Sequence, residues 1–523
     1  MNSFKPMLLT SLKSYDRAQF AKDVTAGIIV AIIALPLSIA LALASGVGPE
    51  AGIFTAIVAG FVISALGGSC VQIAGPTAAF ATIVAGIVAR DGLEGLMTAT
   101  ILAGVFLIIM GFCHFGSLIK FIPYTITTGF TSGIAVTIVI GQLKDFCGIT
   151  YPDGVKPIET MEKLKAFAEN FSTISPDALI VGGVSLAILI VSPLIFKKIP
   201  GSLIAVIAGI LMVQFLPLHV STIGNLYTIS NALPTLHLPV FDMKLIQSAI
   251  PNAFTIAVLA AIESLLSCVV ADGMINSKHR SDTELIAQGA GNIASALFGG
   301  IPATGAIART AANIKNGGRT PVAGMVHSIT LVIVLVVLMP FAGMIPMPTI
   351  AAILFLVAYN MCQWRTFVHL VRTAPKSDII VLFTTFVLTV VFDLVVAIEI
   401  GMVLACLLFI KRMSEETHAD SWVYVDDDSP AVDEHLQKLP LEIRVYEITG
   451  PLFFGAADAI EHIVVKDFTK CLVLRMRSVP TIDSTAMNAL QNLTKLCESK
   501  GITLVFSHVN ETADEDDEKI PAL

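Results

Sequence analysis

The sequence predicts an α-helical membrane protein that crosses the bilayer many times and ends in a small α/β domain. Hydrophobic residues make up 55% of its 523 positions and charged residues 14%, whereas a soluble domain is about one quarter charged. The hydrophobic stretches stop at Lys411 and Arg412, and 21 of the 40 acidic residues lie beyond them. We therefore expect a polytopic membrane domain followed by a soluble one.

The first apolar stretch runs from Val24 to Ala44 and is long enough to cross a bilayer. The residues before it are polar and basic, unlike a cleavable signal. We expect residues 1–22 to form a cytoplasmic arm and the stretch to remain as a transmembrane helix. The eight cysteines lie far apart with no C-x-x-C pair, so the pattern indicates neither a metal site nor a disulfide framework.

Fourteen apolar stretches of roughly 15 to 22 residues, a length that crosses a hydrocarbon core, follow one another as far as Ile410. Lys and Arg test this count, because they gather in cytoplasmic loops. Loops after even-numbered stretches hold twelve Lys and Arg residues and the N-terminal arm holds four more, whereas loops after odd-numbered stretches hold six. Both chain ends are therefore expected in the cytoplasm. The stretches begin near Val24, Ala51, Ile73, Leu96, Thr125, Ala178, Leu203, Ala249, Leu285, Thr304, Val322, Thr349, Ile379 and Leu394.

Stretches three and ten differ from the others, because each is short and opens on glycine, proline and small residues. They begin as Gln72–Phe80 and Gly300–Asn313. If the fourteen stretches form two halves of seven, stretch ten is the counterpart of stretch three. Such a pair indicates an inverted repeat with a substrate site at the membrane midplane. A helix that begins there directs free N–H groups and its positive dipole end at an anion. We expect substrate-binding amides at Thr77, Ala78, Ala79, Phe80, Thr304, Gly305 and Ala306.

Arg309 is the one full charge in stretch ten until Lys315. A buried arginine costs at least ~2.5 kcal/mol in a bilayer unless something compensates it. A bound anion would do so, and we expect Arg309 to belong to the substrate site. In the alternatives, Arg309 pairs with Glu263 or Asp272 to fix helix packing, or extends to the interface near Lys315 and Arg319.

Glu263 is the other isolated charge, and Ser267 lies one turn further along the same helical face. Apolar neighbours make a charged carboxylate costly, so Glu263 is expected to carry a proton during transport. Alternatively, Glu263, Ser267 and Thr304 supply oxygen ligands to Na⁺, or Glu263 makes only a packing hydrogen bond. The pattern indicates no cofactor beyond the coupling ion.

The soluble part shows the order strand, helix, strand, helix, strand. Leu441–Ile448 alternates like a strand, and Ala456–Val465 has a helical pattern. A buried strand over Cys471–Met476, a helix over Ser484–Ser499 behind an Asp483 cap, and a strand over Ile502–Ser507 follow.

Several motifs together resemble the SulP (solute carrier family 26) anion transporters, and the soluble part looks like a STAS domain. The resemblance covers the chain from about Ala18. It implies two inverted repeats of seven transmembrane segments each, with stretches 1–4 and 8–11 as a mobile core and 5–7 and 12–14 as a gate. It also implies elevator-type transport and a homodimer. The motifs are Asp23-Val24-Thr25-Ala26-Gly27, Ala34-Leu35-Pro36-Leu37, Ser45-Gly46-Val47-Gly48-Pro49, Ala74-Gly75-Pro76-Thr77 and Ala308-Arg309-Thr310-Ala311-Ala312-Asn313.

This interpretation divides the chain into the arm 1–22, a transporter domain 23–412, an acidic linker 413–439, a STAS-like domain 440–510 and a disordered acidic tail 511–523. The last strand and helix of a full STAS domain are missing from the pattern. Its Asp483-Ser484-Thr485-Ala486 loop keeps the hydroxyls of a phosphoacceptor loop but lacks the glycine. A helix cap is favoured there over a phosphorylation switch, and a cytoplasmic protein partner is an open alternative.

The leading hypothesis is a secondary active, proton-coupled symporter of the bacterial inner membrane for sulfate, a dicarboxylate or bicarbonate. A Na⁺-coupled bicarbonate symporter and a passive anion channel or exchanger are the alternatives. A nucleobase carrier disagrees with Arg309 and the STAS-like tail, and a membrane-tethered regulator is a further alternative. No phosphate-binding G-x-x-x-x-G-K-[ST] motif occurs, so we expect neither an ATP-driven pump nor another enzyme, and no nucleic-acid partner.

Overall fold

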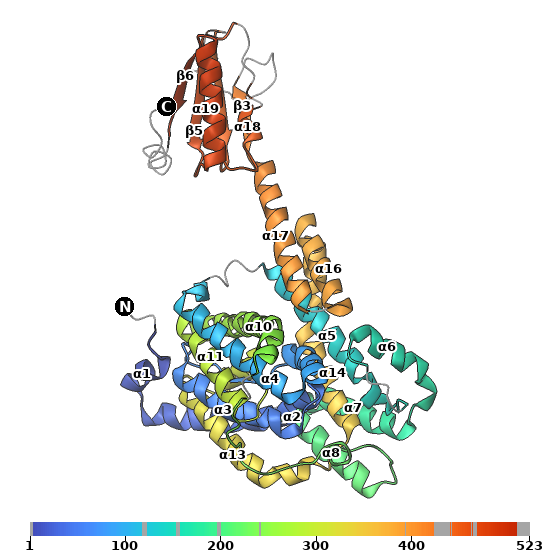
Figure 1. Ribbon diagram of the computed structural model, residues 1–523. Helices are drawn as coiled ribbons and strands as arrows, with labels where there is room; N and C mark the ends of the chain where they lie inside the picture. Colours follow the sequence, from blue (N-terminus) through green and yellow to red (C-terminus); the bar gives the residue numbers. More distant parts are fainter. Residues whose placement is uncertain are drawn as a thin grey trace. The chain divides into compact units, whose positions relative to one another are not determined.

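The computed structural model describes residues 4–117, 123–152, 157–195, 200–239, 242–392, 394–422, 440, 442–461, 463 and 468–509. The chain forms two compact units, residues 1–402 and 403–523 (Figure 1). The first unit is almost entirely helical. Its main helices are α1 (Met7–Ser11), α2 (Arg17–Ala44), α3 (Pro49–Leu66), α4 (Ala81–Phe112), α5 (Tyr124–Cys147), α6 (Thr160–Glu169), α7 (Pro176–Ile195), α8 (Gly201–Phe215), α9 (Ile223–Leu226), α10 (Met243–Ile275), α11 (Ser281–Leu297), α12 (Ile307–Lys315), α13 (Val322–Ala342), α14 (Met347–Cys362), α15 (Trp364–Thr373), α16 (Lys376–Val391) and α17 (Leu394–Glu416).

Each of the fourteen predicted stretches coincides with one of these helices or with part of one. Stretches three and four share α4, whose helical geometry breaks at Gly92, with φ 69° and ψ −167°. A left-handed φ of this kind suits glycine, which has no Cβ to clash. Within the described residues, eight helices are long and apolar enough to cross a membrane. The polytopic helical fold is confirmed, and the number of fourteen crossings stays a prediction.

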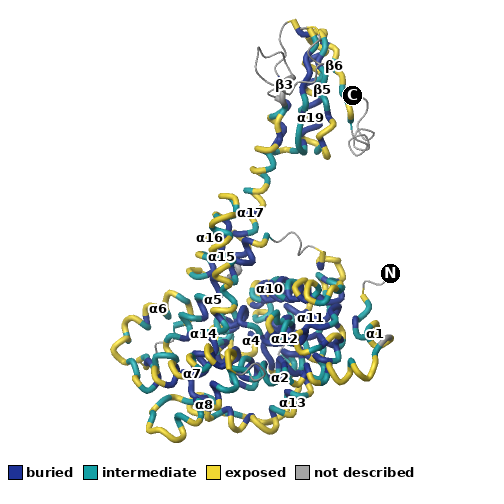
Figure 2. Tube along the Cα trace, turned by 180° about the vertical axis from the view of Figure 1, so that it is seen from behind, coloured by how far each residue is buried: buried dark blue, intermediate teal, exposed yellow. Residues whose placement is uncertain are grey.

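Buried residues gather where α2, α4, α11 and α12 lie together (Figure 2). Apolar side chains on the outer helices are exposed instead, such as Leu194 on α7 and Phe215 on α8. In a bilayer, the outer helices face hydrocarbon chains, which favour apolar side chains. The burial pattern therefore separates a tightly packed centre from a surface suited to lipid.

Glycines let α4 and α11 approach until their backbones touch. A Cβ on Gly289 would lie 2.5 Å from the Gly104 carbonyl oxygen, and one on Gly104 would lie 2.7 Å from the Gly289 carbonyl oxygen. Small residues at helix crossings are the usual means of packing within membranes. This contact joins a helix of the first half of the chain to one of the second half.

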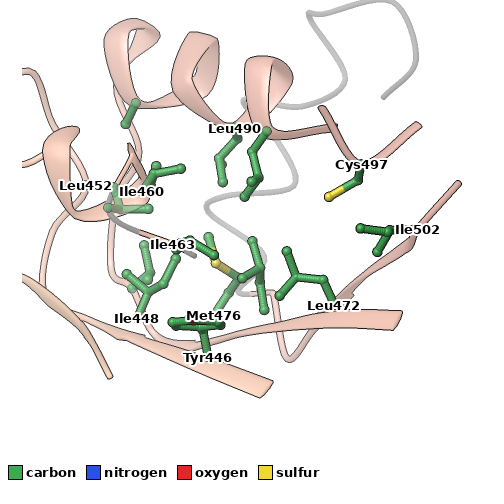
Figure 3. Close-up of a cluster of buried hydrophobic side chains, with 14 residues drawn as sticks. Tyr446, Ile448, Leu452, Ile460, Ile463, Leu472, Met476, Leu490, Cys497 and Ile502 are labelled. Atoms are coloured by element: carbon green, nitrogen blue, oxygen red, sulfur yellow. The ribbon is translucent and has the colours of Figure 1, made fainter. Parts of the chain in front are cut away.

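The second unit has a four-stranded sheet with the order β3-β4-β5-β6, formed by His418–Trp422, Ile443–Thr449, Cys471–Ser478 and Thr503–Ser507. Strands β4, β5 and β6 are parallel and β3 is antiparallel to β4. The helices of this unit are α18 (Asp458–Glu461) and α19 (Ser484–Ser499). Side chains of the sheet, among them Tyr446, Ile448 and Met476, share one core with Leu490 of α19 (Figure 3).

The predicted order of strands and helices is found in this unit, with one addition. Strand β3 lies in the stretch interpreted as the start of an acidic linker. Its sequence His-Ala-Asp-Ser-Trp has no apolar alternation, so the sequence pattern did not indicate a strand there. The remainder of the predicted linker, 423–439, and the predicted acidic tail lie outside the described residues.

The α4–α11 contact predicts a specific sensitivity to one added methyl group. Gly289→Ala should lower the stability by about 1–3 kcal/mol, because the new Cβ meets backbone rather than a side chain that can move. Thermal unfolding of the purified protein in detergent measures this. Gly273→Ala on α10 is the control, since a Cβ there meets nothing within 4 Å, and its melting temperature should stay level or rise. An unchanged melting temperature for Gly289→Ala would contradict the close contact.

Candidate functional site

The two interrupted stretches meet through a short antiparallel pairing. Strand β1 (Ala74–Gly75) pairs with β2 (Thr304–Gly305). The amide of Ala306 continues this pairing by donating to the Ile73 carbonyl at 2.9 Å. Beyond the pairing, each segment turns into a helix. The structure thus brings together the two helix starts that the sequence singled out from opposite halves of the chain.

The helix starts offer different donors than the sequence suggested. On the first side, a 3₁₀ turn η2 (Ala78–Phe80) precedes α4, and the first amides of a helix have no intrahelical acceptor. On the second side, the Ala306 amide is engaged by Ile73, so the first-turn donors of α12 are Ile307 and Ala308. Ala308 is exposed, whereas Ala78, Ala79 and Phe80 are buried. The Phe80 amide donates to the Thr77 carbonyl at 3.4 Å, and which of the predicted amides bind a substrate stays a prediction.

Arg309 lies behind this pairing and is only 1% exposed. Its Nη2 donates to the Pro76 carbonyl at 2.9 Å, while Nε and Nη1 have no hydrogen-bond partner among the described residues. A Cβ on Gly75 would collide with Nη1, so a larger residue there would displace the end of the guanidinium. A buried guanidinium with two unpartnered nitrogens lies next to the residues that begin the first interrupted helix.

The alternative partners of Arg309 are engaged elsewhere. Glu263 accepts a hydrogen bond from the Thr77 hydroxyl at 2.9 Å. Asp272 binds His279 at 2.7 Å and the Ser277 hydroxyl at 2.7 Å. Across the part of the chain that the structure describes, no salt bridge includes Arg309, and its burial disagrees with extension to the interface. The structural ion pair is therefore not found.

Helix α10 contacts both interrupted segments. Glu263 binds Thr77 of the first, and one turn earlier the Ala260 carbonyl accepts from the Thr304 hydroxyl of the second at 2.9 Å. Ser267 points elsewhere, since its hydroxyl donates to the Thr310 hydroxyl at 3.4 Å. Glu263 and Thr304 therefore border the same region, while Ser267 takes part in the packing of α10 on α12.

A cavity of about 270 Å³ continues from the start of α4. It lies between α4, α5, α10, α16 and the α6 region, and Thr82, two residues beyond Phe80, forms part of its wall together with Arg90 and Asn252. All of its walls belong to the first unit. The first helix start thus lies beside a cavity large enough for a small anion.

Two buried polar groups were missed by the sequence interpretation. Glu284 is fully buried and accepts several hydrogen bonds, and His327 is fully buried with neither ring nitrogen partnered. Glu284 follows Asp282 in the first turn of α11, where acidic residues are ordinary. Such a position gives no sequence signal that separates a buried acceptor from a solvated one.

The loop considered for regulation is a helix cap in the structure. Asp483 Oδ1 accepts from the amides of Thr485 at 3.0 Å and Ala486 at 2.9 Å, and its Oδ2 accepts from the Phe454 amide at 2.8 Å. Ser484 and Thr485 are exposed at the start of α19. The cap is formed as expected, and regulation through these hydroxyls stays a prediction.

Residues 20–385 match the sulfate permease family, and residues 438–516 match the STAS domain. The chain belongs to the sulfate permease family. Members of this family are membrane transporters and not enzymes. The expected resemblance to the SulP transporters with a STAS domain is confirmed.

Two relatives cover nearly the whole chain. YvdB of Bacillus subtilis, which its name assigns provisionally to sulfate transport, is 40% identical over 486 residues, covering 92% of this chain and 90% of that protein. The bicarbonate transporter BicA of Picosynechococcus sp. is 34% identical over 488 residues, covering 90% and 85%. The two names assign different anions.

Solved structures share the fold. The transmembrane domain of a cyanobacterial BicA superposes with a TM-score of 0.65 at 30% identity, covering 75% of this chain and 98% of that one. The murine anion transporter Slc26a9 gives a TM-score of 0.87 at 18% identity, covering 98% and 90%. The second likeness concerns the fold alone, and it extends over both units taken together.

The separate partners of Arg309 and Glu263 predict how their variants combine. Arg309→Ala should weaken sulfate binding by roughly 10- to 100-fold, as expected for a hydrogen bond from a charged donor. Adding Glu263→Gln should not restore folded yield or melting temperature, because the two side chains do not neutralise each other. Thermal unfolding of both single variants and the double variant in detergent checks this. Recovery in the double variant would indicate an ion pair.

Proposed function

We propose that the protein is a secondary active transporter of a small oxyanion, sulfate or bicarbonate, in the bacterial inner membrane. One observation carries the proposal. Arg309 is buried beside two interrupted helix starts, and two of its nitrogens, Nε and Nη1, have no hydrogen-bond partner among the described residues. A buried cation needs compensation, and an anion at the helix starts supplies it. The names of the two relatives agree with sulfate or bicarbonate, and a dicarboxylate fits the same chemistry.

The proposed binding groups are the amides of Ala78 and Ala79 on one side and of Ile307 and Ala308 on the other. Arg309 contributes its charge from behind the β1–β2 pairing, partly through the Pro76 carbonyl that it polarises. Phe80 and Thr304 support the site by packing and by the bond to Ala260. In this proposal the backbone amides of the two helix starts bind the anion directly, and the charge of Arg309 attracts it from the other side of the β1–β2 pairing.

Movement of the site is proposed to follow an elevator mechanism. The mobile core contains α2, α3, α4, α10, α11, α12 and α13, which include both helix starts, and α5, α7, α8, α14, α16 and α17 form the gate. The cavity beside α4 lies between Thr82 and Arg90 of the proposed core and Thr137 and Thr389 of the proposed gate. Such a boundary is where relative motion opens a path. Both chain ends are proposed to be cytoplasmic, and the transporter to be a homodimer.

Glu263 is proposed to couple transport to a proton. Its carboxylate binds the hydroxyl of Thr77, the residue directly before the donor amides of Ala78 and Ala79. A negative charge there opposes an arriving anion, and protonation removes that repulsion. In the sodium alternative, Glu263 and the Thr304 region hold Na⁺ at the same place. Either ion raises the affinity for the anion by neutralising Glu263.

Uptake by purified protein in liposomes tests the function. Radiolabelled sulfate and bicarbonate should be compared under an inward proton gradient, an inward sodium gradient and no gradient. Accumulation of either anion above equilibrium supports the proposal, and the gradient that drives it identifies the ion. Flux that follows only the anion gradient would indicate a channel or exchanger instead. Uptake of uracil with neither anion would indicate a nucleobase carrier.

Glu263→Gln should abolish accumulation driven by a proton gradient while leaving sulfate or bicarbonate binding within about threefold, since the amide mimics the neutral carboxyl group. Equilibrium binding in detergent and gradient-driven uptake in liposomes separate the two effects. Asp23→Asn is the control, because Asp23 is a buried carboxylate that binds Tyr15, Gln19, Arg319 and Thr320 away from the site. A Glu263→Gln protein that still concentrates the anion would remove Glu263 from the coupling step.

A further inference from the structure

The segment between α3 and the first helix start, residues 67–76, crosses the buried centre without forming a helix. We refer to it as the first connector. It leads directly to Thr77, and Pro76, its last residue, accepts the hydrogen bond from Arg309. Where this connector lies therefore decides where the amides of Ala78 and Ala79 are presented. The side chains that hold it are part of the site's construction.

Glu284 of α11 holds the first half of the first connector, at Gly68, Ser69 and Gln72. Its Oε2 accepts from the amides of Gly68 at 2.9 Å and Ser69 at 3.2 Å. Its Oε1 accepts from Gln72 Nε2 at 2.8 Å and Gln288 Nε2 at 2.9 Å, and from the Ser264 hydroxyl at 3.4 Å. Glu284 is 0% exposed. Three of these five donors belong to the connector itself.

All five partners of Glu284 are neutral donors, and no salt bridge includes it in the described ranges. A buried acceptor group with this many donors is costly to lose, because each donor is then left unsatisfied. The carboxyl group of Glu284 lies at one end of the connector and the guanidinium of Arg309 at the other. The connector is fixed between them.

The second half of the chain contains a related arrangement made of neutral groups. The second connector, residues 298–306, runs between α11 and α12. Thr55 of α3 accepts from the Ile301 amide at 2.7 Å, and Asn292 accepts from the Ala303 amide at 2.8 Å and donates to the Ala303 carbonyl at 2.9 Å. Helices α3 and α11 thus hold the second connector through Thr55 and Asn292, and α11 holds the first through Glu284.

We propose that Glu284 is a positioning residue for anion binding: it fixes the first connector and thereby sets the place of the Ala78 and Ala79 amides and of the Pro76 carbonyl. This proposal rests on the proposed function. Glu284 does not carry the coupling proton, because its role is to accept hydrogen bonds at both oxygens. Of these two glutamates, Glu263 is the one that binds the Thr77 hydroxyl at the site.

This role makes Glu284 respond differently from Glu263 to the same substitution. Glu284→Gln keeps a carbonyl oxygen for the Gly68 and Ser69 amides, and Gln72 and Gln288 can turn their amide groups to accept from its NH₂. Glu284→Asp keeps the charge but withdraws both oxygens by one methylene from the connector. Reach therefore matters at this position more than charge.

Uptake of sulfate and bicarbonate by full-length variants in liposomes tests the proposal. Glu284→Asp should raise the apparent KM of the transported anion by about tenfold with little change in maximal rate, as the loss of buried hydrogen bonds implies. Glu284→Gln should keep the wild-type KM within about twofold and retain accumulation under the coupling gradient. Loss of accumulation in Glu284→Gln would show that Glu284 carries the ion, and an unchanged KM in Glu284→Asp would show that the connector does not depend on it. Either result overturns the proposal.

Amide hydrogen exchange of the purified protein gives a readout that needs no transport. Glu284→Asp should speed exchange in residues 67–80 and leave 298–306 as in the wild type. Thr55→Val is the matched control on the second connector and should show the reverse pattern. Equal acceleration in both segments would mean general loosening and would also overturn the positioning role. If wild-type protein carries neither anion, the proposed function fails while the exchange result still decides what Glu284 does.

Discussion

The hydrogen bond from Arg309 to the Pro76 carbonyl ties the most costly group of the membrane unit to the start of its first interrupted helix. A guanidinium surrounded by protein and lipid has to be balanced locally. One backbone carbonyl compensates the charge only in part, and Nε and Nη1 have no partner in the described part of the chain. Because the charge of Arg309 is compensated only in part, the centre of the transporter favours a bound anion.

The surroundings of that charge are built from uncharged polar groups. The side chains of Thr304 and Asn313 donate hydrogen bonds to backbone carbonyls of neighbouring segments, and the Thr310 hydroxyl accepts one from the Ile73 amide. These bonds satisfy the backbone where helices are broken, which a membrane interior requires. They add no charge that would compete with a substrate for Arg309. The polar groups of the centre thus divide into a neutral frame and a few isolated charges.

Much of this was accessible from the sequence, because interrupted helices leave a compositional signal. Glycine and proline mark the starts near Pro76 and Pro302, and an isolated Arg309 or Glu263 stands out among apolar residues. The partners of these residues left no signal. Thr77 and Glu263 are 186 positions apart, and Gly68 and Glu284 are 216 apart. Such pairs depend on how helices from the two halves cross, and a buried Glu284 looks in sequence like any acidic residue near a helix start.

The β1–β2 pairing also constrains how the protein is made. Pro76 leaves the ribosome long before Arg309, which lies 233 positions later. At ~5–20 residues per second, the delay is roughly 10 to 50 s. During this time the backbone of Ala74 and Gly75 has no strand to pair with, so the half-finished chain holds unsatisfied polar groups within or beside the bilayer. Until the second half is made, these backbone groups therefore need other hydrogen-bond partners. Water inside the insertion machinery or a membrane-embedded chaperone could supply them.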